Sequence, residues 1–428
     1  MIMKRTFSRT DAIWALLSFT VLIDFFNGLL PSTSIGLVCR GLLLGLCLTS
    51  LLSHNKRAAV VALVSLGLLC ANAAMSFLHH RSMTGLVYDV KMLLKVGMYL
   101  IICMTLTTLY DNGKLSAKQF RWILILNICY APGLYLLTKL LGIGAVSYVH
   151  HNVGFRSVFL SLNSINVAYI VMYTYCVERV FRMDKKDILK WIAALVYVMM
   201  PMLMLGTKTS FGVIAVVFVW YAVTRVFSKK GRKMVLPLLG GLLVIAVLGF
   251  PIIADTVLPT LARQVELLGD RDLITYLLSG RNWMLDTAKE FMAQNQTPFT
   301  TLFGHGYYAS HSQLAQMSEY TKNVVRPVEL DWMDLFLAYG PMSLVITYGH
   351  AGWGLLRNLK YLRTPEVEHY LISGALLLGF SAMAGHVFTE AISATFLALA
   401  VSGVHIFAQE AKKKRDMEQQ EKLPEEKS

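Results

Sequence analysis

The polar stretch from Asp255 to Gly340 holds the residues of this 428-residue chain that are best suited to chemistry. Arg281 follows a Ser-Gly break and opens a helical pattern, so its guanidinium and the free N–H groups of a helix start can converge on one anion. His305 lies in a Gly-His-Gly turn, which lets the imidazole approach a ligand without bulky neighbours. Glu329 precedes the next hydrophobic segment, where a carboxylate can accept a proton. These residue types predict an anion site beside a general base.

Two further carboxylates follow Glu329. Asp331 and Asp334 are three positions apart, so they share one face of a helix if the segment is helical. Carboxylates at a membrane boundary are costly unless they face polar groups. We therefore expect these residues to serve the site, with a solvated helix start as the alternative.

The remainder of the chain is strongly hydrophobic. Hydrophobic residues make up 55% of the sequence and charged residues only 15%. Apolar runs long enough to cross a hydrocarbon core of about 30 Å recur along it, and backbone groups in lipid need helical partners. The sequence therefore predicts an all-α, polytopic membrane protein. We expect about twelve spans, near residues 11–30, 33–53, 58–78, 86–110, 119–141, 157–178, 190–206, 210–227, 234–254, 331–356, 368–385 and 387–408.

The charge distribution predicts the orientation of these spans. The formal net charge is +14, and most of the 40 lysines and arginines fall in alternate loops and at the two termini. The positive-inside rule places those loops and both termini in the cytoplasm. Residues 1–254 then hold nine spans, 255–330 form an extracytoplasmic loop, 331–408 hold three spans, and 409–428 form a charged, disordered cytoplasmic tail. The basic residues indicate topology, and we expect no nucleic-acid partner.

Lysines within one predicted span require a partner. Lys91 and Lys95 are one helical turn apart in the fourth span, where ammonium groups cannot face lipid cheaply. They either pair with Asp24 or Asp89 or bind an anionic ligand such as a phosphate.

Other basic residues lie near the predicted outer ends of the spans. Arg156 follows the fifth span, and Lys208 lies in a Gly-Thr-Lys-Thr-Ser turn that opens a helix and suits an anion. The same turn is also the minimum needed to reverse two helices. Arg263 belongs to an amphipathic segment, residues 261–278, which precedes a helical pattern over 281–295. His386 lies with a carboxylate in the last outer connection.

The histidines and cysteines do not form a metal pattern. The predicted topology puts His79, His80, His150, His151, His305, His311 and His386 on the outer side. No HxxxH or HExxH spacing occurs among them. The six cysteines all fall within predicted spans and include no CxxC pair. We expect neither a metal nor another cofactor.

These features together resemble a known family. Twelve spans, a late extracytoplasmic loop with Ser-Gly-Arg-x-Trp and Gly-His-Gly, and an acidic cluster ahead of Gly340 are similar to the O-antigen ligase/polymerase superfamily. This superfamily includes the Wzy-type polysaccharide polymerases. The motifs lie between residues 200 and 345. In the ligases of this superfamily, the resemblance implies a His-Asn-x-x-Leu pattern at the position where this chain has Glu329 followed by Leu330. This difference from the ligases favours a polymerase.

The resemblance implies a GT-C-like, metal-independent glycosyltransferase of the bacterial cytoplasmic membrane. Its donor and acceptor would be glycans on undecaprenyl pyrophosphate, joined with inversion to build O-antigen, capsule or exopolysaccharide. Glu329 is the first candidate for the base, followed by Asp331 or His305. Arg281 is the first candidate to bind the pyrophosphate. Further candidates for substrate binding are Arg156, Lys208, Lys91, Lys95, Arg263, Asp334 and His386. A flippase and a chain-length regulator of the same pathway are the implied protein partners.

Two alternatives differ in what the protein acts on. A ligase would transfer the lipid-linked glycan to another acceptor with the same chemistry. A transporter of polysaccharide or lipid would line a path with Lys91, Lys95 and other polar residues of the spans. Transporters commonly contain matching broken helices in two halves, and this sequence shows no such symmetry.

Overall fold

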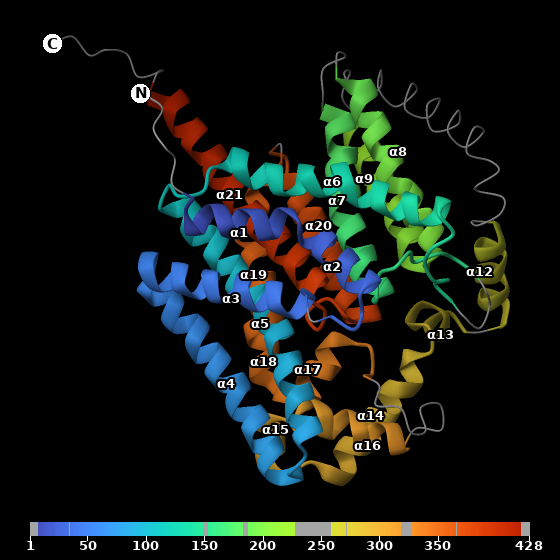
Figure 1. The fold of residues 1–428 in the computed structure, drawn as a ribbon. Coiled ribbons are helices and arrows are strands. Elements are labelled where there is room, and N and C mark those ends of the chain that lie inside the picture. Colours follow the sequence, from blue (N-terminus) through green and yellow to red (C-terminus); the bar gives the residue numbers. More distant parts are fainter. Residues whose placement is uncertain are drawn as a thin grey trace.

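The computed structural model describes residues 7–33, 35–148, 153–182, 187–226, 258–270, 272–317, 327–364 and 366–420. These residues form helices joined by short loops, with no β-strand among them beyond two isolated bridges in the loop after α6 (Figure 1). The predicted all-α class is confirmed. The predicted span 234–254 and the pair His150–His151 lie outside the described residues.

Seven helices in the described part of the chain are long and apolar enough to cross a membrane. They are α3 (Ile35–His54), α4 (Lys56–His80), α5 (Met83–Asp111), α6 (Ala117–Leu140), α8 (Ile188–Leu205), α20 (Val367–Ala384) and α21 (Ala391–Gln420). Helices α1 (Arg9–Ser18) and α2 (Thr20–Leu29) would pass as one span, but they meet at an angle of 58°. The prediction of a polytopic membrane protein is confirmed at this level.

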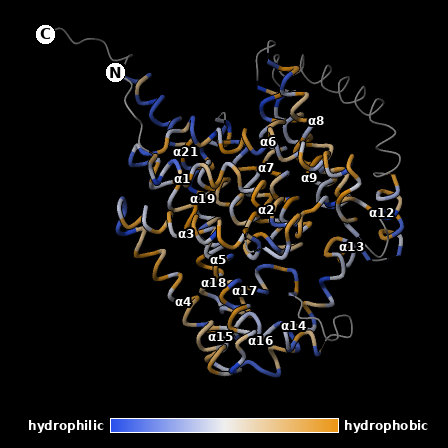
Figure 2. Tube along the Cα trace, viewed as in Figure 1, coloured by the Kyte–Doolittle hydropathy of each residue, from blue (hydrophilic) through white to orange (hydrophobic). Residues whose placement is uncertain are grey.

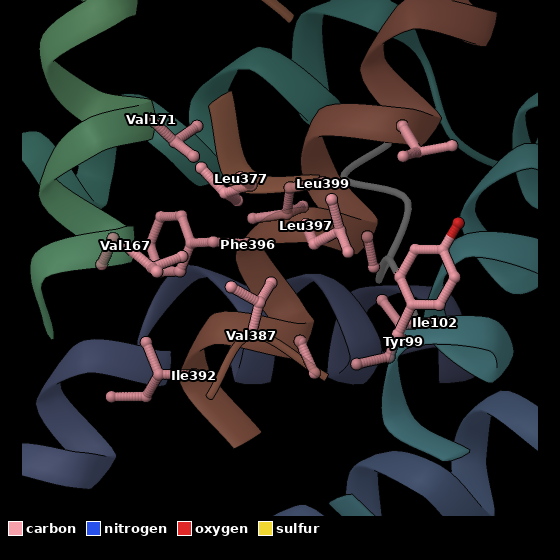
Figure 3. Close-up of a cluster of buried hydrophobic side chains, with 14 of the residues drawn as sticks. Tyr99, Ile102, Val167, Val171, Leu377, Val387, Ile392, Phe396, Leu397 and Leu399 are labelled. Atoms are coloured by element: carbon pink, nitrogen blue, oxygen red, sulfur yellow. The ribbon is translucent and has the colours of Figure 1, made fainter. Parts of the chain in front are cut away.

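A long helix with several polar residues lies at the centre of the bundle. Helix α7 (Leu162–Arg182) is buried along nearly its whole length. Together with α5, α20 and α21 it forms the main core, in which Val167 of α7 lies beside Phe396 of α21 and Tyr99 of α5 lies farther along the same cluster (Figure 3). Packing against protein on all sides lets α7 carry asparagine, glutamate and arginine that a lipid-facing helix excludes. Helix α9 (Lys208–Val226) packs beside it.

The outer helices carry their hydrophobic residues on the surface. Exposed leucines and valines continue along α3, α4 and α9 (Figure 2), for example Leu42, Val64 and Val219. Apolar surface of this extent is found where a protein meets lipid or another protein. Its position on membrane-length helices indicates lipid.

The predicted span 331–356 is not one continuous helix. It consists of α17 (Asp331–Tyr339), α18 (Pro341–Leu344), a π-helical turn η3 (Val345–Gly349) and α19 (His350–Leu356), followed by the short turn η4 (Leu359–Tyr361). Gly340 has φ 72°, and Pro341 supplies no N–H to continue the ladder. A β-carbon on Gly340 would lie 2.2 Å from the carbonyl oxygen of Leu302, so this break also lets two segments approach closely.

The polar stretch folds into short helices with a core of their own. They are α12 (Leu258–Asp270), α13 (Leu273–Leu278), α14 (Arg281–Asn295), α15 (Pro298–Phe303) and α16 (Tyr307–Met317). Phe291, Leu314 and Leu337 join α14 and α16 to α17 in this second core. The predicted helix 281–295 is confirmed, whereas residues 261–278 form two helices, the second capped by Asp272.

A network of charged side chains joins four helices at the N-terminal end of α20. Glu366 receives Arg121 and Arg179 at 2.6 and 3.0 Å, and Glu368 pairs with Arg182 and Arg225. The network ties α6, α7 and α9 to the start of α20. Helix α21 continues beyond it to Gln420, so residues 409–420 are helical and the predicted disordered tail is wrong for that part.

Replacing Gly340 by alanine tests the break in the predicted tenth span. The variant adds a β-carbon where φ is positive and a carbonyl lies in the way, and we expect a loss of about 2–4 kcal/mol. The measurement is the melting temperature of the detergent-purified protein, which should be lower for the variant than for the wild type. Gly352→Ala is the matched control, because nothing lies within 4 Å of its added carbon. Equal melting temperatures for the two variants would contradict this account of Gly340.

Candidate functional site

Arg281 and Glu329 form an ion pair at the centre of the candidate site. The Nη2 group of Arg281 donates to Oε2 of Glu329 at 2.7 Å, and both side chains are largely buried. Ser279 and Gly280 both have positive φ, and this turn places Arg281 at the first position of α14. The structure therefore joins the predicted anion-binding arginine to the predicted base, although 48 positions separate them.

Asp334 fixes the backbone that carries Glu329. Its carboxylate accepts the N–H groups of Val328 and Glu329 at 2.8 and 3.1 Å. Nε2 of His311 lies 2.8 Å from the same carboxylate, and its Nδ1 lies 2.6 Å from the carbonyl oxygen of Tyr307. Both ring nitrogens thus face acceptor oxygens, which holds the imidazole in one orientation against the carboxylate. Asp334 is almost fully buried, so it positions Glu329 and does not face a substrate.

Asp331 holds the connection between α20 and α21. It accepts the N–H groups of His386, Val387 and Phe388 at 2.6–3.0 Å, and it also accepts the hydroxyls of Ser381 and Thr389. The residue is completely buried. Its carboxylate is saturated by protein donors, so this geometry does not support the predicted role of Asp331 as an alternative base and indicates a positioning role instead.

This connection brings His386 to the ion pair. Nε2 of His386 lies 4.0 Å from Oε1 of Glu329, so the carboxylate stands between an arginine and a histidine. His386 and Glu329 both have positive φ, a conformation that non-glycine residues adopt at a cost of about 1 kcal/mol or more. Gly385 makes the approach possible, since a β-carbon there would lie 2.4 Å from the carbonyl oxygen of Glu329.

The charge of His386 is stabilised by its surroundings. Burial by itself would lower the pKa of His386, but Glu329, and beyond it Asp331 and Glu390, outweigh that effect and raise the pKa above its ordinary value of 6.5. The carboxylate of Glu329 thus lies between a guanidinium and an imidazole whose protonated form is favoured.

An apolar cavity of about 860 Å³ opens beside the site. It lies between α9, α12, α13 and α20, and its lining includes Leu277 and Ala384. Leu277 is followed by Leu278, whose carbonyl oxygen accepts a hydrogen bond from Arg281. Ala384 is followed by Gly385, which lies against Glu329. Lys208 also lines it and contacts Tyr276 through both the carbonyl and the ring face. The lining is mostly apolar and includes Lys208, which suits an apolar chain with an anionic end.

The other predicted substrate-binding residues lie elsewhere. His305 packs edge-on against Phe291 and lines a separate cavity of about 350 Å³ with Asn72 and Asn295. Arg263 pairs with Glu266 within α12. Arg156 lies in the loop after α6, where its buried Nε has no hydrogen-bond partner in the described part of the chain.

Lys91 and Lys95 do not pair with the carboxylates considered from the sequence. Lys95 lies 3.3 Å from Glu390, whereas Asp24 pairs with Arg40 and Asp89 accepts the N–H of Tyr308. Sequence reasoning missed these pairings, and it also missed His311 as a support for Asp334. The carboxylate of Glu390 and the Gly-His pair at 385–386 could have indicated these contacts, but their partners Lys95 and Glu329 are far away in sequence.

The sequence matches no protein-family model, and a search among curated proteins finds no match. The resemblance to the O-antigen ligase/polymerase superfamily therefore stays a prediction. Within the described residues, no three His, Cys, Asp or Glu side chains are grouped so that they hold a metal ion.

Asp331→Asn tests the buried carboxylate. The amide retains the shape but turns an N–H₂ group toward backbone donors, so we expect a loss of about 2–4 kcal/mol and a lower melting temperature. Asp286→Asn, an exposed carboxylate paired with Lys289 on α14, should leave the melting temperature unchanged. An unchanged melting temperature for Asp331→Asn would refute its role.

The raised pKa of His386 predicts a pH-dependent stability. The protonated form is favoured in the folded state, so its contribution is full below the ordinary pKa of 6.5 and is lost as the pH rises through the raised value. The melting temperature of purified protein should fall over that interval, and His386→Asn should flatten the fall. His54→Asn, which removes a histidine bonded to the backbone of α3, should keep the wild-type profile. The same profile in His386→Asn would disprove the assignment.

Proposed function

We propose that the protein is a membrane glycosyltransferase that polymerises undecaprenyl-pyrophosphate-linked oligosaccharide repeat units into surface polysaccharide. The observation that carries this proposal is the position of Glu329 between Arg281 and His386. The large apolar cavity is lined by Leu277 and Ala384, which are close in sequence to Arg281 and His386. A substrate that fits has an apolar chain, an anionic group at its end and a hydroxyl or leaving group next to the carboxylate.

The cations serve the leaving group. In the proposed reaction the bond between the anomeric carbon of the donor and its phosphate oxygen breaks, and the electron pair leaves on the pyrophosphate. Arg281 and the imidazolium of His386 stabilise this developing charge. The apolar cavity holds part of the polyprenyl chain, with Lys208 at its polar margin.

Glu329 serves the attacking group. The hydroxyl oxygen of the acceptor sugar forms the new bond to the anomeric carbon from the opposite side, and its proton passes to Glu329. The products are the lengthened glycan, still on its lipid, and free undecaprenyl pyrophosphate. Displacement from the opposite side inverts the anomeric configuration.

The ion pair links substrate binding to the availability of the base. Arg281 donates to Oε2 of Glu329 at 2.7 Å and so occupies one oxygen of the proposed base. A pyrophosphate carries more charge than a carboxylate and competes for the guanidinium. Binding of the donor thus draws Arg281 away and leaves Glu329 free to act as the base.

The proposal includes the predicted membrane topology. The twelve spans of a GT-C-like arrangement are the seven helices of membrane length, the bent pair α1–α2, α7, α9, the broken segment from α17 to α19, and the span predicted at 234–254. Both termini and the arginine–glutamate network then face the cytoplasm, and Arg281, Glu329 and His386 face the exterior of the cytoplasmic membrane. A flippase supplies substrate to that face, and a chain-length regulator is a further partner.

Substitutions at the ion pair test the reaction. With purified protein and lipid-linked repeat units, we expect Glu329→Gln to lower the rate about 10²–10⁴-fold and Arg281→Ala about 10²–10³-fold. Arg281→Lys keeps a charge and should retain more activity than alanine. Lys289→Ala, an exposed lysine on the same helix as Arg281, is the matched control with wild-type rate. Gel separation of labelled products measures chain length, and wild-type chains from folded Glu329→Gln protein would refute the proposal.

The same assay separates a polymerase from a ligase. A polymerase makes lipid-linked oligomers when it is given lipid-linked repeat units alone. A ligase makes no product until a second acceptor is added, and that result would overturn polymerisation while leaving the proposed chemistry of Glu329 in place.

A further inference from the structure

A second cavity, of about 350 Å³, collects three cationic side chains. It lies between α2, α3 and α5, and Arg40, Lys91 and Lys95 line it. Asn27 and Thr33 add polar groups, and Leu37 is among the apolar residues that complete the lining. At 1.5 Å per residue, Lys91 and Lys95 lie about 12 and 18 Å along α5 from its first residue. The cavity thus combines positive charge with apolar walls.

The charges in this cavity do not balance. Arg40 pairs with Asp24, and Lys95 lies 3.3 Å from Glu390. No carboxylate partner of Lys91 is found among the described residues, so one positive charge remains. An uncompensated cation on a membrane-length helix is costly unless it meets water or an anion. A phosphate satisfies it best, because an arginine fork and two ammonium groups can each bind a different oxygen.

We propose that this cavity binds the phosphate groups of a lipid, and that under the proposed function, on which this assignment rests, the lipid is the acceptor glycan carrier. Polymerisation joins two lipid-linked substrates, and each brings its own anionic group. The cavity beside Arg281 then takes the donor, and the cavity at Lys91 takes the acceptor. The apolar walls accommodate the first part of the acceptor's chain.

One residue links the two sites. Glu390 pairs with Lys95, and it follows His386 by four positions in the connection that Asp331 holds. A phosphate that binds Lys95 competes with Glu390 for the ammonium group. Binding of the acceptor therefore acts on the same connection that places His386 beside Glu329.

Lipid binding to the full-length protein tests the inference. Native mass spectrometry counts undecaprenyl pyrophosphate molecules per chain, and a parallel series uses phosphatidylglycerol. We expect two undecaprenyl pyrophosphates on the wild type, and one each on Lys91→Glu and Arg281→Ala. Lys91→Ala should weaken binding of the second lipid about tenfold. Lys91 suits this test because no ion pair to it is found in the described residues. Its replacement therefore leaves no carboxylate without its partner. Lys289→Ala is the control and should bind as the wild type does.

Each outcome decides a separate point. If Lys91→Glu retained two undecaprenyl pyrophosphates and bound phosphatidylglycerol as the wild type does, the cavity would be overturned as a phosphate site. If this variant lost phosphatidylglycerol but retained both undecaprenyl pyrophosphates, the assignment to the acceptor would be overturned. If Arg281→Ala retained two lipids, the donor site of the proposed function would fail, whereas the cavity at Lys91 would still be judged by its own variant.

Discussion

Two buried carboxylates at the start of α17 hold the candidate site together. Asp334 binds the backbone on its N-terminal side, and Asp331 binds the connection that follows α20. Because both side chains project from one helix, they fix Glu329 and His386 relative to each other. A buried charge is tolerated only when donors surround it, so neither connection can move without exposing a carboxylate that has lost its partners. The geometry of the ion pair depends on this constraint.

The sequence predicts the parts of the site that depend on local patterns. The Ser-Gly break placed Arg281 at a helix start, and the spacing of Asp331 and Asp334 placed them on one face; both predictions are confirmed. The roles of Asp331 and Asp334 are harder to predict from the sequence. Asp334 binds backbone five and six positions before it, but its other partner comes from α16 and the partners of Asp331 come from α20 and the connection after it. No local pattern indicates which distant group a carboxylate will meet. The same holds for His386 beside Glu329 and for Lys95 beside Glu390.

Hydrophobic length predicts most helices, but it fails where tertiary packing replaces lipid. Helix α7 is too polar to count as a span by composition, yet the core around it accommodates its polar residues. The break at Gly340 follows from positive φ and a close carbonyl, which a hydropathy profile does not detect. The last residues of α21 form a helix although they lack an apolar face, and Tyr110 on α5 contacts Glu410 and Lys413 there.

The apolar cavity has one firm wall and one weakly held wall. Helix α20 is fastened at both ends, by the arginines at Glu368 and by Ser381 bound to Asp331. In α12 and α13, by contrast, Thr260 and Thr275 are the buried residues, and most of their large apolar side chains are exposed. Local opening takes the path of least buried surface, so displacement of α12 and α13 costs the least free energy. A long apolar ligand therefore reaches the cavity most readily from the side of α12, while the wall formed by α20 stays in place.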